Sequence, residues 1–217
     1  MKVLNEKNLL TADAHFNMAR LVTGKSLKND LKNQALIITI RVTDFRQVER
    51  LQKAVYNKLC KLFYGRVATS CDDVFGFLIS ADVEASRTGR VSSRTLSAPY
   101  DPHLHCLMLF SKSDWLRVEG NIEEWSSMIK KALDELDEVE RSGVHVDRFD
   151  PSKTPLEYRD CPLNYYASYC NKSKKHANRY GFDGYGASVF PYDICATDKE
   201  KRQQVYLRRK FEQGFKI

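Results

Sequence analysis

The chain of 217 residues contains no long apolar run, and nothing in it approaches the roughly 20 consecutive apolar residues that a membrane-spanning helix requires. Its N-terminal sequence, MKVLNEKNLLTADAH, lacks the continuous apolar stretch of a secretory signal peptide. No internal repeat or low-complexity tract is visible. We therefore expect a protein of the cytoplasm, in a bacterium or a host cell, with no membrane partner.

The six cysteines form no C-x-x-C pair, which excludes zinc-ribbon and thioredoxin-like sites. Several lie within apolar patterns, which indicates reduced and half-buried thiols rather than disulfides. A complete phosphate-binding P-loop is also absent. Thr23–Ser26 matches its last positions, but Ala19 stands where the motif requires its first glycine. We expect no ATPase and no built-in helicase.

Positive charge is in excess, since 35 Lys and Arg residues against 28 Asp and Glu residues give a net charge of +7 and a pI near 9.0. This balance suits a polyanionic partner. The chain also has 11 tyrosines and 11 phenylalanines, side chains on which nucleic-acid bases stack. Composition therefore favours a nucleic-acid partner without demonstrating one.

Hydrophobic periodicity predicts the secondary structure. Buried strands are expected at Ala35–Val42 (ALIITIRV), Val74–Val83, His103–Phe110 and Val144–Phe149. Helices are expected at Phe45–Tyr64, Asn121–Leu136, Pro162–Lys174 and Asp198–Gln213. The segments Arg87–Pro102 and Gly181–Pro191 have loop compositions.

These elements predict an α+β protein with a central antiparallel β-sheet flanked by helices. The polar and basic residues 1–34 are expected to form a helical or partly mobile arm. Residues 35–217 are then a single domain with a C-terminal helical extension.

The sequence His103-Leu104-His105 stands within an apolar strand. Side chains alternate across a strand, so both histidines project from one face, about 7 Å apart along the strand. Two imidazoles so placed can bind one divalent metal ion. The alternative is a hydrogen-bonded and inert histidine pair at the start of a strand.

Mg²⁺ or Mn²⁺ would require an oxygen ligand as well. The preceding strand supplies Asp82 and Glu84, which share one face. If this strand pairs antiparallel with the histidine strand, its C-terminal end lies beside the histidines. We favour Glu84, because it is nearer to the connecting loop. The alternative is an acidic strand end that faces solvent.

Tyrosines cluster on the helix predicted at Pro162–Lys174. Tyr165, Tyr169 and Lys172 are spaced to form one stripe, with Tyr166 about 100° away around the helix. In a functional interpretation Tyr169 is a covalent nucleophile and Lys172 a neighbouring cation that assists it. In the structural alternative the tyrosines are packing aromatics and Lys172 is a solvated helix end.

Two basic groups flank these motifs, one in the loop before the histidines and one just after the tyrosines. Either group could bind a DNA backbone or be merely solvated. The candidate DNA-binding residues are Arg87, Arg90, Arg94, Lys174, Lys175 and Arg179.

Taken together, the motifs resemble those of the HUH endonucleases, in particular the rolling-circle replication initiators of plasmids, phages and small single-stranded DNA viruses. PHLHCLMLF is similar to their metal motif and YCNK (Tyr169–Lys172) to their nucleophile motif, while ALIITIRV falls where their first strand motif occurs. The resemblance covers roughly residues 35–175.

The resemblance implies a ferredoxin-like or RRM-like sheet with the histidines on a central strand. It implies that His103, His105 and Glu84 bind Mg²⁺ or Mn²⁺, that Tyr169 attacks the scissile phosphate, and that Lys172 assists. A 5′-phosphotyrosine forms and a free 3′-OH is left to prime synthesis. Some members use two tyrosines, which makes Tyr165 a candidate second nucleophile. The expected partners are single-stranded DNA or an origin hairpin, with a separate host helicase and polymerase.

Three other functions remain open at this point. A transposase or relaxase would use the same chemistry, although the third histidine and N-terminal tyrosine usual in conjugative relaxases are not apparent. A histidine-triad hydrolase would need a histidine where Leu107 stands. A non-catalytic RRM-like nucleic-acid-binding module would account for the charge and the aromatic residues, but not for the joint occurrence of H-x-H and Tyr-x-x-Lys.

Overall fold

The computed structural model describes residues 34–43, 47–66, 74–82, 102–156, 162–163, 166 and 187–190. The predicted helix Asp198–Gln213 and nearly all of the predicted N-terminal arm and of the loop Arg87–Pro102 lie outside the described residues. The division into an arm and one domain therefore stays a prediction. Among the described helices, none has both the length and the apolar character needed to cross a membrane.

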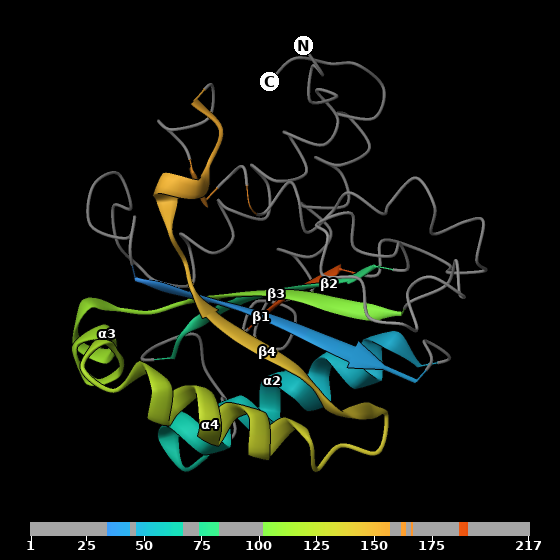
Figure 1. Ribbon diagram of the computed structural model, residues 1–217. Helices are drawn as coiled ribbons and strands as arrows, with labels where there is room; N and C mark the ends of the chain where they lie inside the picture. The colour runs from blue at the N-terminus through green and yellow to red at the C-terminus, as the bar shows by residue number, and fades with distance from the viewer. Residues whose placement is uncertain are drawn as a thin grey trace, which may run out of the picture.

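The described chain forms an α+β structure around one antiparallel sheet (Figure 1). Its elements are β1 (Ala35–Val42), α2 (Val48–Tyr64), β2 (Gly76–Asp82), β3 (His103–Leu109), α3 (Lys112–Glu119), α4 (Ile122–Leu133), β4 (Val139–Arg148) and β5 (Ala187–Phe190). A short 3₁₀ turn at Pro151–Lys153 follows β4.

The five strands lie in the order β4-β1-β3-β2-β5, and each neighbouring pair is antiparallel. Without β5 and α3, the elements run β-α-β-β-α-β with strand order 4-1-3-2, which is the ferredoxin-like arrangement. The predicted α+β class with a central antiparallel sheet flanked by helices is therefore confirmed, and the histidine strand β3 lies between β1 and β2.

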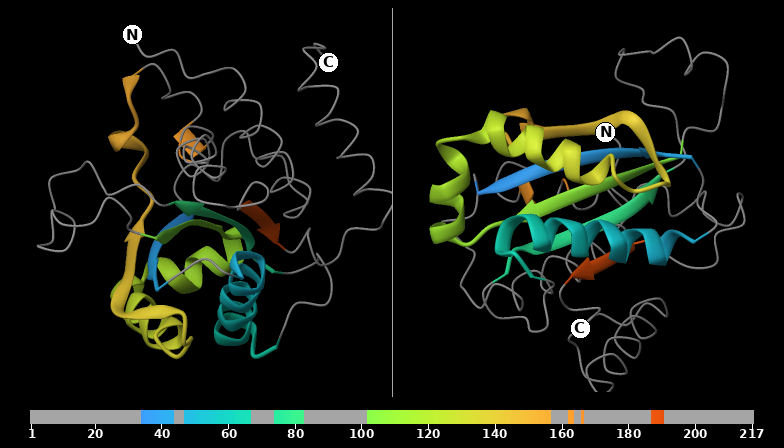
Figure 2. Two further views of the ribbon diagram at one scale, coloured as in Figure 1. Left: turned by 90° about the vertical axis from the view of Figure 1, so that its right-hand side faces the viewer. Right: turned by 90° about the horizontal axis from the view of Figure 1, so that it is seen from below.

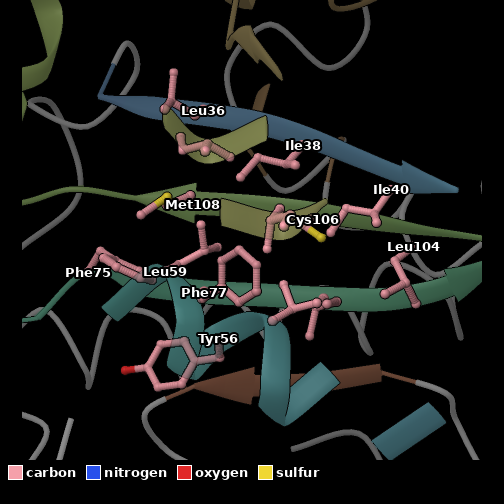
Figure 3. Close-up of a cluster of buried hydrophobic side chains, with 14 of the residues drawn as sticks. Leu36, Ile38, Ile40, Tyr56, Leu59, Phe75, Phe77, Leu104, Cys106 and Met108 are labelled. Atoms are coloured by element: carbon pink, nitrogen blue, oxygen red, sulfur yellow. The ribbon is translucent and has the colours of Figure 1, made fainter. Parts of the chain in front are cut away.

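Helices α2 and α4 cover one face of the sheet (Figures 1 and 2). On the helix side β1 contributes Leu36, Ile38 and Ile40, all fully buried. Leu104, Cys106 and Met108 of β3 lie on the same side (Figure 3). Each fully buried Leu or Ile side chain stabilises the fold by about 1.5–3 kcal/mol. This apolar layer therefore contributes strongly to the packing of the sheet against the helices.

Helix α2 turns a regular apolar stripe toward that layer. Leu51, Val55 and Leu59 recur at a spacing of four residues, which places them on one helix face, and all are buried. The helix ends at Gly65, whose φ of 69° is left-handed and whose N–H donates to the carbonyl of Lys61. The sequence predicted a start at Phe45, and the structure begins the helix at Val48.

Stacked aromatic rings join the two covering helices. Phe63 of α2 and Trp125 of α4 are parallel, with ring centroids 4.4 Å apart. Trp125 also donates its indole N–H to the carbonyl of Arg117 at 3.2 Å, which ties α4 to the end of α3. Such pairs add about 0.5–1.5 kcal/mol beyond area burial, and they fix the position of α4 under the sheet.

The structure differs from the prediction at three further places. Helix α3 was not predicted, because it is short and holds only Trp115 and Val118 in the core, although Ser111 caps it by accepting from the Asp114 N–H. Strand β4 begins at Val139 rather than Val144, because a bulge interrupts its alternating pattern.

The third error lies in the segment Gly181–Pro191, which was predicted to be a loop. It contains β5, which pairs with β2 through contacts such as Phe77 with Phe190. A four-residue strand flanked by glycine-rich sequence forms through this pairing with a distant strand, which local composition does not report.

Candidate metal centre

The antiparallel pairing of β2 with β3 assembles the candidate metal centre. Asp82 lies directly opposite His103, and Ser80 lies directly opposite His105. Directly opposed residues share one face of a sheet, so Asp82 and both histidines project together from the face opposite α2 and α4. The two histidines therefore share a face, and the hairpin pairing that the sequence required is present.

Three donor atoms from these side chains converge. His103 Nε2 and His105 Nε2 are 3.1 Å apart, and Asp82 Oδ2 lies 3.6 Å from the first and 3.3 Å from the second. An ion bound about 2.1 Å from three ligands, at angles of 90–120°, separates those ligands by about 3.0–3.6 Å. The observed spacings fall in that interval, so the three atoms can share one metal ion.

The two imidazole rings are held nearly perpendicular, at 85° with centroids 4.7 Å apart. This arrangement lets both Nε2 atoms point at one position while the rings avoid each other. Asp82 is 0%, His103 5% and His105 7% exposed. A carboxylate removed from water is costly unless cationic or hydrogen-bonding groups surround it, and a bound metal ion or a protonated histidine would offset that cost here.

The same geometry permits a hydrogen bond between the two Nε2 atoms when one imidazole donates to the other. Binding of an ion instead requires a lone pair on both Nε2 atoms, and hence a proton on each Nδ1 of the neutral rings. The two arrangements have different protonation but nearly the same heavy-atom positions. Metal titration separates them, because only the second requires an ion.

The carboxylate of the group is Asp82, whereas the sequence favoured Glu84. Asp82 is the last residue of β2, and its direct pairing with His103 brings its side chain to the histidines. Glu84 lies outside the described residues. Within the part of the chain that the structure describes, Asp82 is therefore the oxygen donor of the candidate site.

The neighbouring strand β1 brings further polar residues to the same face. Arg41 lies directly opposite His103, and Thr39 lies directly opposite His105. Both are half-buried. The sequence reasoning missed these two residues because they stand in an apolar strand, and only the β1–β3 register places them beside the histidines.

The predicted nucleophile region is largely outside the described residues, including Tyr165, Tyr169 and Lys172. The same holds for the candidate DNA-binding residues Arg87, Arg90, Arg94, Lys174, Lys175 and Arg179. Tyr166 is described, and its half-buried ring meets the buried Phe149 edge-on with centroids 6.2 Å apart. This contact gives Tyr166 a packing role beside the end of β4.

Comparison of the chain with protein-family models, curated proteins and solved structures finds no significant match. The fold and the site by themselves define an α+β protein. One face of its antiparallel sheet is packed by helices, and the other carries a buried Asp-His-His group able to bind a metal ion.

Proposed function

We propose that this protein is a metal-dependent endonuclease and strand transferase that nicks single-stranded DNA through a tyrosine and starts rolling-circle replication. The observation that carries the proposal is the convergence of Asp82, His103 and His105 on one buried position, on the sheet face opposite α2 and α4. An ion site supported by a central strand is held rigidly, as a site that must orient a phosphate requires.

The mixed oxygen and nitrogen donor set favours a divalent ion that accepts both kinds of ligand. One carboxylate and two imidazoles suit Mn²⁺ better than Mg²⁺, because Mg²⁺ prefers oxygen ligands and imidazole favours the later transition metals. We therefore propose Mn²⁺ as the tighter ligand of the two, with Mg²⁺ as a weaker alternative. When bound, such an ion supplies Lewis-acid polarisation of a phosphate oxygen.

In the proposed reaction Tyr169 is the nucleophile and Lys172 assists it. The phenol oxygen of Tyr169 attacks the phosphorus of the scissile phosphodiester, and the bond to the 3′-oxygen breaks. The electron pair leaves with that oxygen, which takes up a proton and becomes a free 3′-OH. The 5′-phosphate remains bonded to Tyr169, and the proton that its phenol gives up to solvent balances the one that the 3′-oxygen takes up. Lys172 offsets the negative charge that develops. Tyr165 is the candidate nucleophile for a second cleavage. The 3′-OH freed by that cleavage attacks the phosphotyrosine of Tyr169, releases its phenol and rejoins the strand.

The composition of the chain supports a DNA partner. The net charge of +7 favours binding of a polyanion. An origin hairpin or single strand is the proposed substrate, and a separate helicase and polymerase would complete replication, because no P-loop is present in the sequence. A transposase or relaxase would share this chemistry, and an RRM-like binding module would share the sheet without the cleavage.

The test is the formation of a covalent protein–DNA adduct. The full chain is incubated with single-stranded circular DNA or a mixed pool of labelled oligonucleotides in Mn²⁺ or Mg²⁺, and the products are separated on denaturing gels. Tyr169→Phe, Tyr165→Phe and His105→Ala are tested in parallel with EDTA-treated wild type. We expect an adduct that is lost in EDTA, in His105→Ala and in Tyr169→Phe.

Each other result has a defined meaning. Loss of the adduct in Tyr165→Phe alone keeps the class of enzyme and reassigns the nucleophile. A wild-type protein that binds single-stranded DNA but forms no adduct and binds no Mn²⁺ refutes the nuclease and supports the binding module. Closure of nicked circles by the wild type, measured in the same reactions, supports a strand transferase over a simple nuclease.

A further inference from the structure

Arg41 occupies a position beside the candidate metal centre that the sequence motifs do not identify. It lies on β1 directly opposite His103, and Asp82 lies directly opposite the same histidine on β2. The three residues thus form one row across the sheet, with the histidine in the middle. Directly opposed side chains have Cβ atoms about 4.5–5.5 Å apart, so Arg41 and His103 are neighbours on the face opposite α2 and α4.

Strand β4 is interrupted at this row. The β1–β4 register pairs Ile40 with Val144 but Val42 with Val139, so a bulge lies opposite Arg41. Within the bulge Ser142 has a φ of 57°, and a Cβ placed on Gly143 would lie 3.0 Å from the Arg41 Cβ. Gly143 therefore packs closely against Arg41, and the absence of a side chain at Gly143 is what permits this approach. Bulges that redirect a side chain are frequent beside functional sites.

The chemistry of this row favours an anion. A guanidinium group next to an ion site repels a second cation, but it attracts a group that carries negative charge to the ion. Arginine binds phosphate through paired N–H donors in a fixed planar geometry, which makes it suited to a phosphodiester. Its half-buried position on the sheet strengthens such a contact relative to one in open solvent.

We propose that Arg41 binds a non-bridging phosphate oxygen of a nucleic-acid strand held at the Asp82–His103–His105 centre. This inference rests on the proposed function, since it assumes that the strand's phosphate lies at the ion. It adds a residue that contacts substrate and that belongs to neither the ligand set nor the basic groups recognised in the sequence.

The test measures binding rather than cleavage, so it can be judged whether or not the protein forms an adduct. Mn²⁺ affinity is measured by calorimetry for the wild type, Arg41→Gln and Arg41→Lys. The affinity of a labelled single-stranded oligonucleotide is then measured with Mn²⁺ and with EDTA. Arg50→Gln is the matched control, because it removes the same charge from an exposed position on α2, away from the site.

We expect Arg41→Gln to bind Mn²⁺ at least as tightly as the wild type. Its oligonucleotide affinity in Mn²⁺ should fall by about 10- to 100-fold, the range for a lost hydrogen bond to a charged group. Arg41→Lys should recover part of this loss, since it keeps the charge without the planar pair of donors. Arg50→Gln should change the affinity less than about threefold, as exposed charges do.

Two results would overturn the inference. One is an equal oligonucleotide affinity for Arg41→Gln and Arg50→Gln in Mn²⁺. The other is a loss of Mn²⁺ binding in both Arg41 variants, which would make the residue structural. If Arg41→Gln fails to fold by circular dichroism, Arg41→Lys decides alone, and a wild-type affinity for that variant in Mn²⁺ refutes the contact. Failure of the proposed nuclease would appear separately, as a wild type that forms no adduct.

Discussion

Asp82 lies closer to His105 than to His103, although His103 is its direct partner across the sheet. The Asp82 Oδ2 atom is 3.3 Å from His105 Nε2 and 3.6 Å from His103 Nε2. The carboxylate therefore reaches along the strand to a position shared by both imidazoles. A carboxylate paired with one histidine alone would not need this displacement, so the geometry is compatible with three ligands around one ion.

The first prediction concerns the identity of the carboxylate ligand. Asp82→Asn should lower Mn²⁺ affinity by more than the ~10–100-fold that loss of an outer-shell partner costs, because it removes a directly converging oxygen charge. Glu84→Gln is the matched control with the same loss of charge two residues along the chain. Calorimetric titration of both variants measures the effect. A larger loss in Glu84→Gln would assign the ligand to Glu84, as the sequence first suggested.

The second prediction is that Mn²⁺ stabilises the folded protein. A ligand at 100 times its Kd adds about 2.7 kcal/mol, provided that it binds only the folded chain. For a chain of this size that gain corresponds to a Tm about 5–10 °C higher. Thermal unfolding followed by circular dichroism, with Mn²⁺ and with EDTA, measures the shift.

His105→Ala serves as the control for this stabilisation, since it removes one of the three donors and leaves Asp82 and His103 in place. Its Tm should be the same in Mn²⁺ and EDTA. A shift of equal size in His105→Ala would mean that the ion binds elsewhere on the chain, and the Asp82–His103–His105 group would lose its assignment.

The sequence predicted the parts of this structure that depend on local pattern. Ala35–Val42 is a strand because β-branched residues fill it, and His103-Leu104-His105 shares a face because strands alternate. The choice between Asp82 and Glu84 depended on where β2 ends, and a boundary of one or two residues is beyond what periodicity resolves. Arg41 could not be identified as part of the site from the sequence. Its position opposite His103 depends on the β1–β3 register, which is a property of the folded sheet.

The third prediction concerns the close approach of Gly143 to β1. Gly143→Ala would place a Cβ 2.8 Å from the Glu140 carbonyl oxygen and 3.0 Å from the Arg41 Cβ. Because backbone must move to accept it, we expect a loss of about 1–3 kcal/mol in the free energy of unfolding. Urea denaturation measures this loss.

Gly120→Ala is the matched control for Gly143→Ala. Gly120 ends α3 in a right-handed conformation, and a Cβ there meets nothing within 4 Å. Alanine should leave stability unchanged or raise it by up to about 1 kcal/mol, because it restricts the unfolded chain. If both variants lose stability equally, the contact of Gly143 with β1 is not the cause.

The fourth prediction follows from the hydrogen bond between Tyr64 and Asp114. The phenol OH donates to Asp114 Oδ2 at 3.0 Å, and burial, together with the nearby Asp114 charge, holds the pKa of Tyr64 well above its ordinary value of 10.0. Tyr64→Phe should cost about 1 kcal/mol at pH 8. Asp114 keeps its hydrogen bond from Ser111, so the cost stays moderate.

The raised pKa gives this difference a pH dependence. Above pH 10 the unfolded phenol ionises while the folded one stays neutral, so the contribution of Tyr64 to stability falls as the pH rises. The loss is about 1.4 kcal/mol per pH unit, and the difference between the wild type and Tyr64→Phe should close near pH 11. Denaturation of both proteins between pH 8 and 11 measures it, and a constant difference over that range would contradict the prediction.

The fifth prediction concerns the two basic groups proposed to bind DNA. For single strands each phosphate contact contributes about 0.7 to the slope of log affinity against log salt concentration. Replacing the arginines at 87, 90 and 94 by glutamine should therefore reduce that slope by about 2 if all three contact phosphates, and the same holds for the residues at 174, 175 and 179.

The matched control replaces three exposed lysines on the helix side of the sheet: Lys53, Lys112 and Lys130. Since the control changes net charge equally, a similar reduction in slope would show that overall charge, rather than contact at either group, drives the binding.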